Sequence, residues 1–419
     1  MHHVIVGSSI AGIEAARALR ARAPDAEITV IGDEAPRPFA RTALMYVLAG
    51  QLRLEDTVFV EAEALAALRL RRLHDRVDTV DVAARHVHLA AGGVLAYDRL
   101  LLAVGSRARR LDVPGADLPG VHRFVRLEDL RALDGAARPG ARVAVVGGGL
   151  VGVEVAEVLH ARGLHVHWLV REPSVWPAAL DADEGALVAA HVRGHGVDVR
   201  TAADLRAITQ SAAGLRLELD GAPLEVDLVV ECIGVRPRTA FLAGSGMPLG
   251  ADGGIEVDDH LAVLGVPDVW AAGDCANVTW ADGARRPETL WYTARDQGRV
   301  AGAAMAGAST PYRRTCWVNA AKFFDVEWCT AGWVPTVEAQ RTEPGRWQTW
   351  SRAWPHAPAS LRIVVRDGRV FGFTALGRRW DTAVWLRWIQ DKRPLDWVLA
   401  HLDAAGFDEE LTPRLPGGA

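Results

Sequence analysis

Near the N-terminus, a short apolar run is followed by a glycine-rich turn and an Ala-rich stretch of helical pattern, and this succession occurs again further along the chain. In the two copies, the strand, the turn and the beginning of the helix are residues 3–6, 7–12 and 13–17, and then residues 142–146, 147–152 and 153–156. A second apolar strand follows each helix, at residues 27–31 and 165–170. Strand, glycine turn, helix and strand in this order predict the βαβ unit of a doubly wound parallel sheet.

Three further apolar runs have the length of strands and end in turns, at residues 97–105, 227–234 and 269–274. They predict buried strands that extend the two sheets. A long helix is expected to follow the last of them, from about Trp291 to Gly307.

The pattern changes after about residue 307. Glycine turns of the first kind no longer occur, and ten of the fifteen Trp residues lie between Trp317 and Trp397. Alternating apolar positions at residues 361–366 and 369–373 flank Asp367-Gly368, which predicts a β-hairpin. These features indicate a separate C-terminal α+β domain.

Two helical stretches are expected at the end of this domain, at residues 381–390 and 395–402. Around the first of them, four apolar residues recur at helical spacing and share one face: Trp380, Val384, Trp385 and Trp388. Such a face is buried either in the core or in a subunit interface, so a homodimer through this domain is one of the two interpretations.

Composition excludes several classes of protein. The net charge of the 419 residues is -5, and no Lys/Arg-rich run occurs, so nucleic acid is not an expected partner. No signal peptide and no run of eighteen apolar residues is present, which argues against a membrane span and for the cytoplasm. The four Cys residues form no CxxC motif, as expected in a reducing compartment.

Histidine pairs give little reason to expect a metal site. His86 and His88 are two residues apart on a predicted strand, as are His165 and His167, so each pair is expected to share one solvated strand face. His191 and His195 are four apart, but two neighbouring glycines weaken the helix that would align them. No metal is therefore expected.

The second glycine turn fits the pattern G-x-G-x-x-G. Gly147 permits the tight turn, Gly149 lets a pyrophosphate approach the backbone, and Gly152 allows the helix to pack closely on the strand. The free N–H groups and the partial positive charge at the helix N-terminus suit phosphates. Between a strand and a helix, this motif predicts a dinucleotide site.

The first glycine turn departs from the pattern. Gly7 and Gly12 occupy the outer positions, but Ser9 stands where the middle glycine belongs. A serine narrows the approach of a phosphate, although its hydroxyl can itself donate a hydrogen bond. Asp33 and Glu34, at the end of the next strand, are placed to bind the ribose of an adenosine, which supports a second dinucleotide site.

Further motifs give the chain a resemblance to the two-Rossmann FAD/NAD(P)-dependent reductases, which include ferredoxin and rubredoxin reductases, the flavin module of nitrite reductase and NADH oxidases. The resemblance covers residues 3 to 330 and rests on the order of five motifs: residues 31–34, 38–41, 102–106, 272–276 and 297–302. It implies that Arg41 and Gly105 contact the FAD and that Asp274 holds the flavin's ribityl chain. The C-terminal segments 319–324 and 405–408 look like those of a bacterial subgroup.

Two departures from the family narrow the chemistry. Relatives that reduce peroxides or disulfides carry a redox Cys in the stretch that is here Arg41 to Tyr46, and this chain has no Cys before Cys232. A thiolate beside the flavin is therefore not expected. Ferredoxin reductases pair a Lys with a helix Glu near the flavin; here Tyr46 aligns with the Lys and Glu154 with the Glu. These two residues are the catalytic candidates, expected to shape the nicotinamide pocket.

The choice of nicotinamide cofactor depends on the end of the strand at 165–170. An acid there favours NADH, but Val170 occupies that position and Arg171 follows it. An arginine can bind the 2′-phosphate of NADPH with two hydrogen bonds. Glu172 beside it and the lack of a second arginine at Pro177 argue the other way, so the pattern favours NADPH only slightly.

These observations predict an α/β fold with two Rossmann-like domains, the FAD domain being interrupted by the NAD(P) domain, and an additional C-terminal α+β domain. The expected bounds are 1–112 and 245–307 for FAD, 113–244 for NAD(P), and 308–419 for the C-terminal, interface-like domain. The expected activity is hydride transfer from NAD(P)H to FAD and onward to a small-molecule or redox-protein acceptor such as a ferredoxin. The alternatives are an NAD(P)H-sensing flavoprotein scaffold and a reductase subunit of a larger complex.

Overall fold

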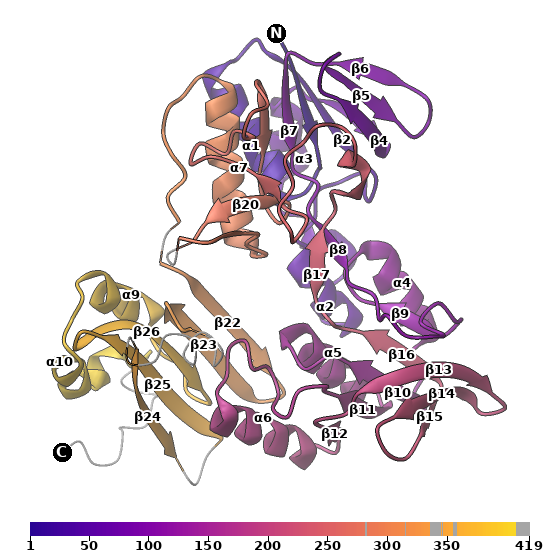
Figure 1. Ribbon diagram of the computed structural model, residues 1–419, viewed down its shortest axis with the longest axis vertical. Coiled ribbons are helices and arrows are strands. Elements are labelled where there is room, and N and C mark those ends of the chain that lie inside the picture. The colour runs from indigo at the N-terminus through magenta and orange to yellow at the C-terminus, as the bar shows by residue number, and fades with distance from the viewer. Residues whose placement is uncertain (281–282, 315, 336–344, 346, 355–357, 408–419) are drawn as a thin grey trace. The chain divides into compact units, whose positions relative to one another are not determined.

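The computed structural model describes all residues except 281–282, 315, 336–344, 346, 355–357 and 408–419 (Figure 1). The chain divides into two compact units. Unit 1 comprises residues 1–109, 123–134 and 234–314, and unit 2 comprises residues 110–122, 135–233 and 315–419. Asp408, the last residue of the C-terminal motif, lies outside the described residues.

A five-stranded parallel sheet forms the centre of unit 1. Its order is β19–β7–β1–β2–β3, with the bounds Val269–Ala271, Arg99–Leu102, His2–Val6, Glu27–Gly32 and Arg71–His74. The middle strand β1 is covered on both faces, and Val4 and Ile5 have no exposed surface. A parallel strand buried in this way needs apolar residues on both sides, which explains its uninterrupted apolar sequence.

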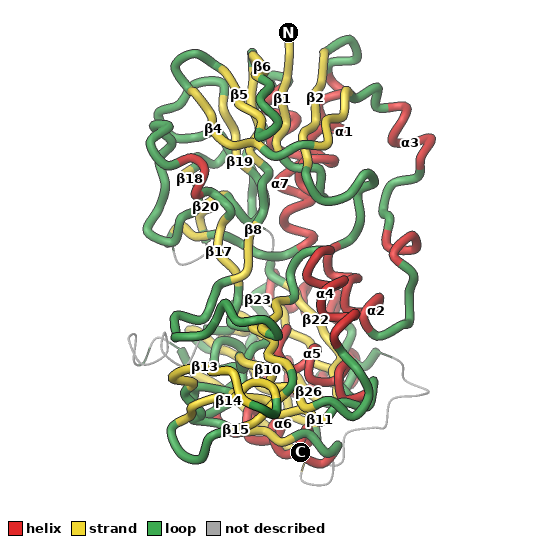
Figure 2. Tube along the Cα trace, turned by 90° about the vertical axis from the view of Figure 1, so that its right-hand side faces the viewer, coloured by secondary structure: helices red, strands yellow, loops and turns green. Residues whose placement is uncertain are grey.

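Two helices pack closely together in unit 1. Helix α1 spans Ile10–Arg22 and α7 spans Trp291–Met305, and both views show them side by side (Figures 1 and 2). A Cβ at Gly298 would lie 2.2 Å from the carbonyl oxygen of Ala11, and one at Gly302 2.1 Å from that of Ala15. The glycines of α7 therefore allow its backbone to touch α1 directly.

Smaller elements complete unit 1. The strands are β4 Val77–Asp81, β5 His86–Leu89, β6 Val94–Ala96, β8 Ser106–Ala108, β17 Val235–Pro237, β18 Ile255–Glu256, β20 Ala276–Thr279 and β21 Arg285–Arg286. The helices are α2 Leu44–Leu48 and α3 Ala62–Ala67, with single 3-10 turns at Arg41–Ala43, Leu54–Thr57 and Ala240–Leu242. Helix α4, Leu127–Ala136, begins in this unit.

The second βαβ unit lies in unit 2. Its sheet has the order β12–β11–β10–β16–β9, with the bounds Asp198–Arg200, His165–Leu169, Arg142–Val146, Leu228–Glu231 and Val121–Arg123. Helices α5, Leu150–Ala161, and α6, Ala182–Gly194, follow β10 and β11. An antiparallel sheet of β13 Leu205–Ser211, β14 Gly214–Leu219 and β15 Leu224–Val226 is added to it. Both predicted Rossmann units, and with them the α/β fold class, are confirmed.

The C-terminal part of unit 2 is an antiparallel sheet with helices. The strand order is β22–β23–β26–β25–β24, with the bounds Val318–Phe323, Val326–Gly332, Arg369–Leu376, Ala359–Arg366 and Gln348–Trp354. Helices α9, Thr382–Gln390, and α10, Leu395–Ala400, and a 3-10 turn at Leu402–Ala405 follow. Asp367 and Gly368 have φ of 53° and 71°, which is the conformation of the predicted hairpin turn.

The tryptophan face of α9 belongs to the core. Trp385 and Trp388 are at most 6% exposed, and Trp385 stacks on Phe373 of β26 with ring centroids 4.1 Å apart. Trp380, predicted on the same face, instead precedes the N-cap residue of α9 and forms a β-bridge with Gly406, and it too is buried. The core interpretation of this face is therefore confirmed, and the face is not left open for a second subunit.

The C-terminal sheet is held to the second Rossmann segment by a buried ion pair. Arg362 of β25 binds Glu184 of α6, with Nη2 and Oε2 2.9 Å apart, and both side chains are at most 4% exposed. The same guanidinium donates to the carbonyl oxygen of Ala179 at 2.8 Å. Removing Arg362 would leave the Glu184 carboxylate buried without a cation, whereas removing Glu184 would leave Arg362 with the more distant Asp181, 3.5 Å away.

Candidate dinucleotide sites

The first glycine turn connects β1 to α1 and requires glycine at two of its positions. Gly7 has a φ of +122°, and a Cβ there would lie 2.0 Å from the carbonyl oxygen of Ala103. A Cβ at Gly12 would lie 1.9 Å from the carbonyl oxygen of Gly7. Both contacts are with backbone, so any larger residue would force the turn apart.

Ser9 fits the middle position of this turn without strain. It is the N-cap residue of α1 with φ −88° and ψ −166°, ordinary extended values, and its counterpart Gly149 has nearly the same angles, −90° and −175°. The Ser9 side chain makes no capping hydrogen bond to its helix. The hydroxyl is therefore available to a phosphate at the helix N-terminus.

The carboxyl ends of β7 and β19 lie next to this turn. Asp274 comes after β19, and its carboxylate accepts a hydrogen bond from the Ser106 hydroxyl at 2.6 Å. The backbone N–H of Gly273 donates to the Gln297 side chain of α7 at 2.7 Å. Gly105, at φ +67°, has no atom within 4 Å of where its Cβ would stand. This edge of the sheet therefore places the carboxylate of Asp274, held by Ser106, in the same region as the uncrowded backbone at Gly105.

The Asp274 carboxyl group is poorly solvated. Burial raises its pKa, and the hydrogen bond from Ser106 and the charge of Arg41 offset this effect only in part. A partly buried carboxylate of this kind gains from additional hydrogen-bond donors, such as the hydroxyls of a polyol chain.

The two acids after β2 are each bound to arginines. Glu34 accepts from Arg41 at 2.8 Å and from the backbone N–H of Leu127 at 2.8 Å. Asp33 accepts from Arg238 at 2.7 Å and from Arg126 at 3.3 Å. Burial opposes ionisation of both acids, but the arginines outweigh it and lower both pKa values.

The sequence did not predict that arginines bind these two acids. It singled out Arg41, but as a residue that contacts the FAD. Arg238 is 205 residues from Asp33 in the chain, and no local pattern marks such a pairing. Gln297 lies in a motif that the sequence did single out, but its bond to Gly273 is also visible only in the folded chain. In the structure, Arg41 is bound to Glu34 and to the carbonyl oxygen of Val125.

The second glycine turn, in unit 2, repeats the geometry of the first. Gly147 has a φ of +126°, with its Cβ position 2.3 Å from the carbonyl oxygen of Cys232, and the Cβ position of Gly152 is 2.1 Å from the Gly147 oxygen. The indole N–H of Trp168 donates to that same oxygen at 2.9 Å. Nothing lies within 4 Å of a Cβ at Gly149, which leaves room for a ligand.

Glu154 follows this turn on α5. Burial, reinforced by the charge of Glu157, raises its pKa to about 7. The structure gives it no hydrogen bond or ion pair within the described part of unit 2. Tyr46, its expected partner, lies on α2 of unit 1 with 54% of its surface exposed. The pairing of these two residues stays a prediction.

Val170 and Arg171 lie beyond β11 in different environments. Arg171 is 74% exposed and contacts Glu172 at 3.0 Å. Val170 has no exposed surface, and its Cγ1 would lie 2.5 Å from a Cβ at Gly148. Val170 therefore packs beneath the glycine turn, and an acid introduced there would be buried rather than offered to a ribose.

The buried cysteines are poor nucleophiles. Burial raises the pKa of the Cys232, Cys275 and Cys329 thiols to about 12, 11 and 12. Cys275, next to Asp274, donates to the carbonyl oxygens of Leu102 and Ala272, as expected of a small buried residue in a tight turn.

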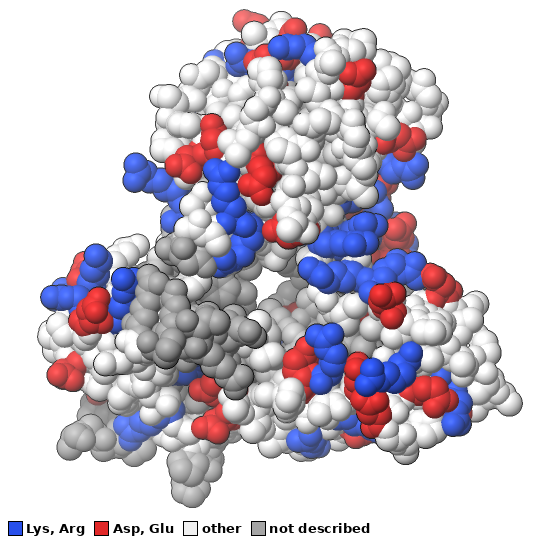
Figure 3. Space-filling view, in the orientation of Figure 1, with Lys and Arg blue, Asp and Glu red and all other residues white. Residues whose placement is uncertain are grey.

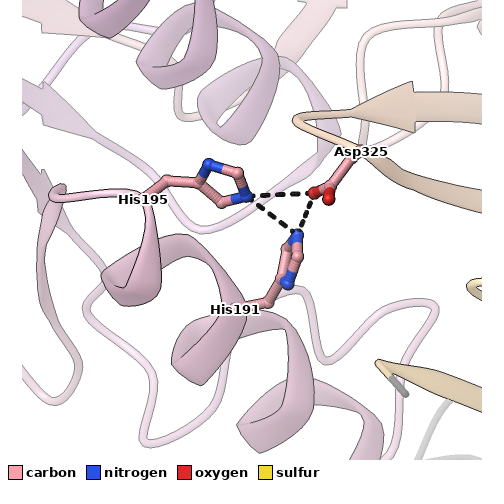
Figure 4. A group of neighbouring side chains, drawn as sticks. All are labelled: His191, His195 and Asp325. Atoms are coloured by element: carbon pink, nitrogen blue, oxygen red, sulfur yellow. Dashed lines mark hydrogen bonds and ion pairs between the residues drawn. The ribbon is translucent and has the colours of Figure 1, made fainter.

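The expectation that His191 and His195 are not aligned is wrong. Helix α6 continues through Gly194 and places His195 at its C-cap, one turn beyond His191. Their Nε2 atoms are 3.2 Å apart, and both contact Asp325 (Figure 4). The sequence could not show this, because the carboxylate comes from the distant β22–β23 turn.

Comparison with known proteins agrees with this geometry. Residues 1–298 match the family model described as pyridine nucleotide-disulphide oxidoreductase. The chain is 34% identical over 321 residues to the biphenyl dioxygenase system ferredoxin–NAD(+) reductase component of Paraburkholderia xenovorans (strain LB400), which covers 76% of this chain and 78% of the relative. It is 29% identical to the chlorobenzene dioxygenase ferredoxin reductase component of Cupriavidus sp. (strain PS12), with 94% of both chains covered.

The fold is also that of solved relatives. A crystal structure of a ferredoxin reductase from Rhodopseudomonas palustris superposes with a TM-score of 0.83 at 25% identity, covering 97% of this chain and 100% of the other. The chain belongs to the pyridine nucleotide-disulphide oxidoreductase family. It is an FAD-dependent NAD(P)H oxidoreductase, as the resemblance implied.

The residues present fit both cofactors. In unit 1, the open turn at Ser9 and Gly105 and the undersolvated carboxylate of Asp274 suit the pyrophosphate and ribityl chain of FAD. In unit 2, the open position at Gly149 suits a second pyrophosphate. Among the described residues, no helix is long and apolar enough to span a membrane.

Proposed function

We propose that this chain transfers electrons from NAD(P)H through FAD to a small redox protein of the ferredoxin type, without a catalytic thiol. FAD supplies the chemistry that accepts a hydride from the nicotinamide and releases electrons singly. The two curated relatives named above are ferredoxin reductase components, and the matches cover about three quarters of both chains for the first and 94% of both chains for the second. This similarity is the observation that carries the proposal.

The protein's own residues supply binding and electrostatics. Ser9 and the backbone of the first glycine turn hold the FAD pyrophosphate, and Asp274 orients the ribityl chain. Asp33 and Glu34 bind the adenosine ribose while Arg126, Arg238 and Arg41 keep them ionised. Gly147, Gly149 and Gly152 hold the nicotinamide dinucleotide through the N-terminus of α5.

Glu154 and Tyr46 are proposed to order the nicotinamide ring. With a pKa of about 7, Glu154 changes charge near neutral pH. Its ionised form favours the cationic, oxidised nicotinamide, so its titration should affect hydride transfer. Tyr46 provides a polar ring in place of the cation that ferredoxin reductases are expected to have there.

The absence of a thiol step is supported by the cysteines. No Cys precedes Cys232 in the sequence, and the Cys232 and Cys275 thiols have pKa values raised to about 12 and 11. At neutral pH such thiols are almost never the reactive thiolate. All four cysteines are free, which fits the cytoplasm as the proposed location.

The net charge of -5 gives no reason to propose a nucleic-acid partner. On the face drawn in Figure 3, Asp and Glu side chains lie beside many of the Lys and Arg side chains, some of which form short groups.

A reductase subunit of a larger complex is the second candidate. The chain is 31% identical over 314 residues to the NADH-dependent phenylglyoxylate dehydrogenase subunit epsilon of Aromatoleum evansii, with 72% of that protein covered. This interpretation keeps the same half-reactions and changes only the acceptor. A homodimer is a further possibility, although the Trp face of α9 is already buried and does not support it.

The test is anaerobic reduction of the FAD-bound protein with NADH and NADPH, followed by a panel of acceptors. We expect complete flavin bleaching and rapid reoxidation by a ferredoxin coupled to cytochrome c, with slow turnover on disulfides and oxygen. Faster turnover on a disulfide than on any ferredoxin would refute the proposal. Slow reduction with every acceptor, accompanied by a change of oligomeric state on adding NAD(P)H, would favour the sensing scaffold.

A further inference from the structure

A cluster of potential metal ligands lies in unit 2, apart from both glycine turns in the sequence. His191 is in the last turn of α6, His195 is the C-cap of the same helix, and Asp325 is at the tip of the turn between β22 and β23 (Figure 4). One ligand atom from each residue lies within 4.8 Å of the others. Among the described residues, this is the one group of three such side chains that meets this criterion.

The distances in the cluster resemble those between ligands of one metal ion. The two Nε2 atoms are 3.2 Å apart, and His195 Nε2 is 3.0 Å from Asp325 Oδ1. The Nε2 atom of His191 contacts the same oxygen. Ligand atoms about 2.0–2.1 Å from a tetrahedral zinc ion are separated by about 3.3–3.4 Å, close to the spacing of the two Nε2 atoms, whereas the contact between His191 and Asp325 is shorter and would have to widen around an ion.

Hydrogen bonding alone accounts poorly for this convergence. Two imidazole Nε2 atoms that face each other need one proton between them, while the carboxylate oxygen needs a proton from each ring to bind both. The three groups cannot satisfy all three contacts with neutral rings. A cation that accepts a lone pair from each of the three atoms removes the conflict.

The surroundings hold Asp325 in place. Phe324 has a φ of +52°, its ring lies 4.8 Å from that of His195, and its carbonyl oxygen accepts from Lys322 at 2.7 Å. The Phe324 N–H donates to the Glu157 carboxylate of α5. The hairpin tip is thus tied to two helices of the Rossmann segment, and the carboxylate is kept facing the imidazoles.

The cluster is open to solvent on one side. The side chain of His191 is 15% exposed, that of His195 38% and that of Asp325 68%. An ion from solution can therefore enter, and a water molecule can complete its coordination. Two imidazoles, one carboxylate and an open position form a donor set that suits Zn²⁺.

We propose that His191, His195 and Asp325 form a binding site for a divalent transition-metal ion, best matched by Zn²⁺. The ion links the C-terminal end of α6 to the β22–β23 hairpin. Because the folded chain holds the three ligands together, bound Zn²⁺ stabilises the native state of unit 2.

The test uses the full-length, FAD-bound protein after dialysis against a chelator. Titration with ZnCl₂ in a calorimeter should give one high-affinity site per chain, and Co²⁺ should produce the visible absorption of a low-coordinate site at wavelengths beyond the flavin bands. The double variant His191→Asn/His195→Asn should bind Zn²⁺ at least a hundredfold more weakly. Asp325→Asn, at an exposed position, should weaken binding at least tenfold.

The matched control is His86→Asn/His88→Asn, which removes two histidines whose rings are 6.4 Å apart on β5 and which belong to no group of three potential metal ligands among the described residues. It should keep wild-type affinity and the wild-type rise in melting temperature with Zn²⁺. Flavin content and circular dichroism verify that each variant is folded. If the wild type binds no Zn²⁺, or binds it no better than the His191/His195 variant, the cluster is only a hydrogen-bonded ion pair and the proposal is wrong.

Discussion

Glu154 allows a quantitative test, because its environment changes its protonation near neutral pH. Its pKa is raised from 4.5 to about 7 by burial and by Glu157. The difference is 7 − 4.5, about 2.5 units, and at about 1.4 kcal/mol per unit it corresponds to roughly 3 kcal/mol. Because the folded chain prefers the neutral acid, this group stabilises the fold most below pH 4.5, and the contribution is lost as the pH rises through 7.

Glu154→Gln removes this titration while keeping the size of the side chain. At pH 8 the variant should unfold at a higher temperature than the wild type, by up to roughly 3 kcal/mol in stability, and at pH 4.5 the two should be nearly equal. The measurement is thermal unfolding of the FAD-bound protein between pH 4.5 and 9. Glu63→Gln, on the exposed face of α3, is the control and should follow the wild type.

The same variant tests the proposed role at the nicotinamide. In stopped-flow experiments, flavin reduction by NAD(P)H should show an inflection near pH 7 in the wild type and none in Glu154→Gln. If the variant and the wild type have the same pH profile in both stability and reduction, Glu154 is not the titrating group and its assignment fails.

Three further predictions concern the cofactors. Asp274→Ala should weaken FAD binding about ten- to a hundredfold, since hydrogen bonds to a charged group contribute about 1.5–3 kcal/mol; full flavin retention after gel filtration would contradict the assignment. Replacing all four Cys with Ala or Ser should leave hydride transfer within about tenfold of the wild type, about 1.4 kcal/mol of barrier, in stopped-flow reduction. Arg171→Ala should reduce the NADPH/NADH preference by on the order of tenfold, at the low end for a charge-assisted contact because the side chain is 74% exposed; equal changes for both nucleotides would show that Arg171 is a solvated surface residue.

Local sequence patterns predicted the framework of the fold well. The apolar runs, the glycine turns and the Asp367-Gly368 hairpin depend on interactions between near neighbours, so their positions in the sequence carry the information. Helical spacing correctly placed Trp385 and Trp388 on one face of α9, whereas Trp380 precedes the N-cap residue Asp381 and forms a β-bridge with Gly406. Only the structure could show that this face packs on β26.

Contacts between distant segments could not be predicted in this way. The acids Asp33 and Glu34 are visible as a motif, but the choice of Arg238 and Arg41 as their partners depends on how loops from three segments meet. The same limit applies to Asp325, which lies 134 residues from His191 and 130 residues from His195 in the sequence and meets them only in the folded chain. Local rules also underestimated α6: the penalty of about 1 kcal/mol for Gly194 is small compared with the packing of a helix that has a complete N-terminal capping box.

The two glycine turns separate what the fold requires from what the ligand requires. The fold itself requires glycine at the outer positions, Gly7 and Gly12, because a Cβ there would lie only 2.0 and 1.9 Å from backbone carbonyl oxygens. The middle position has ordinary extended angles in both turns, and a Cβ at Gly149 would meet nothing. A serine at this position therefore costs the fold nothing, and its only effect is on what approaches the helix N-terminus. Ser9 therefore changes how the first turn contacts a phosphate and leaves the fold of the turn unchanged. Its presence is compatible with a dinucleotide site at this turn.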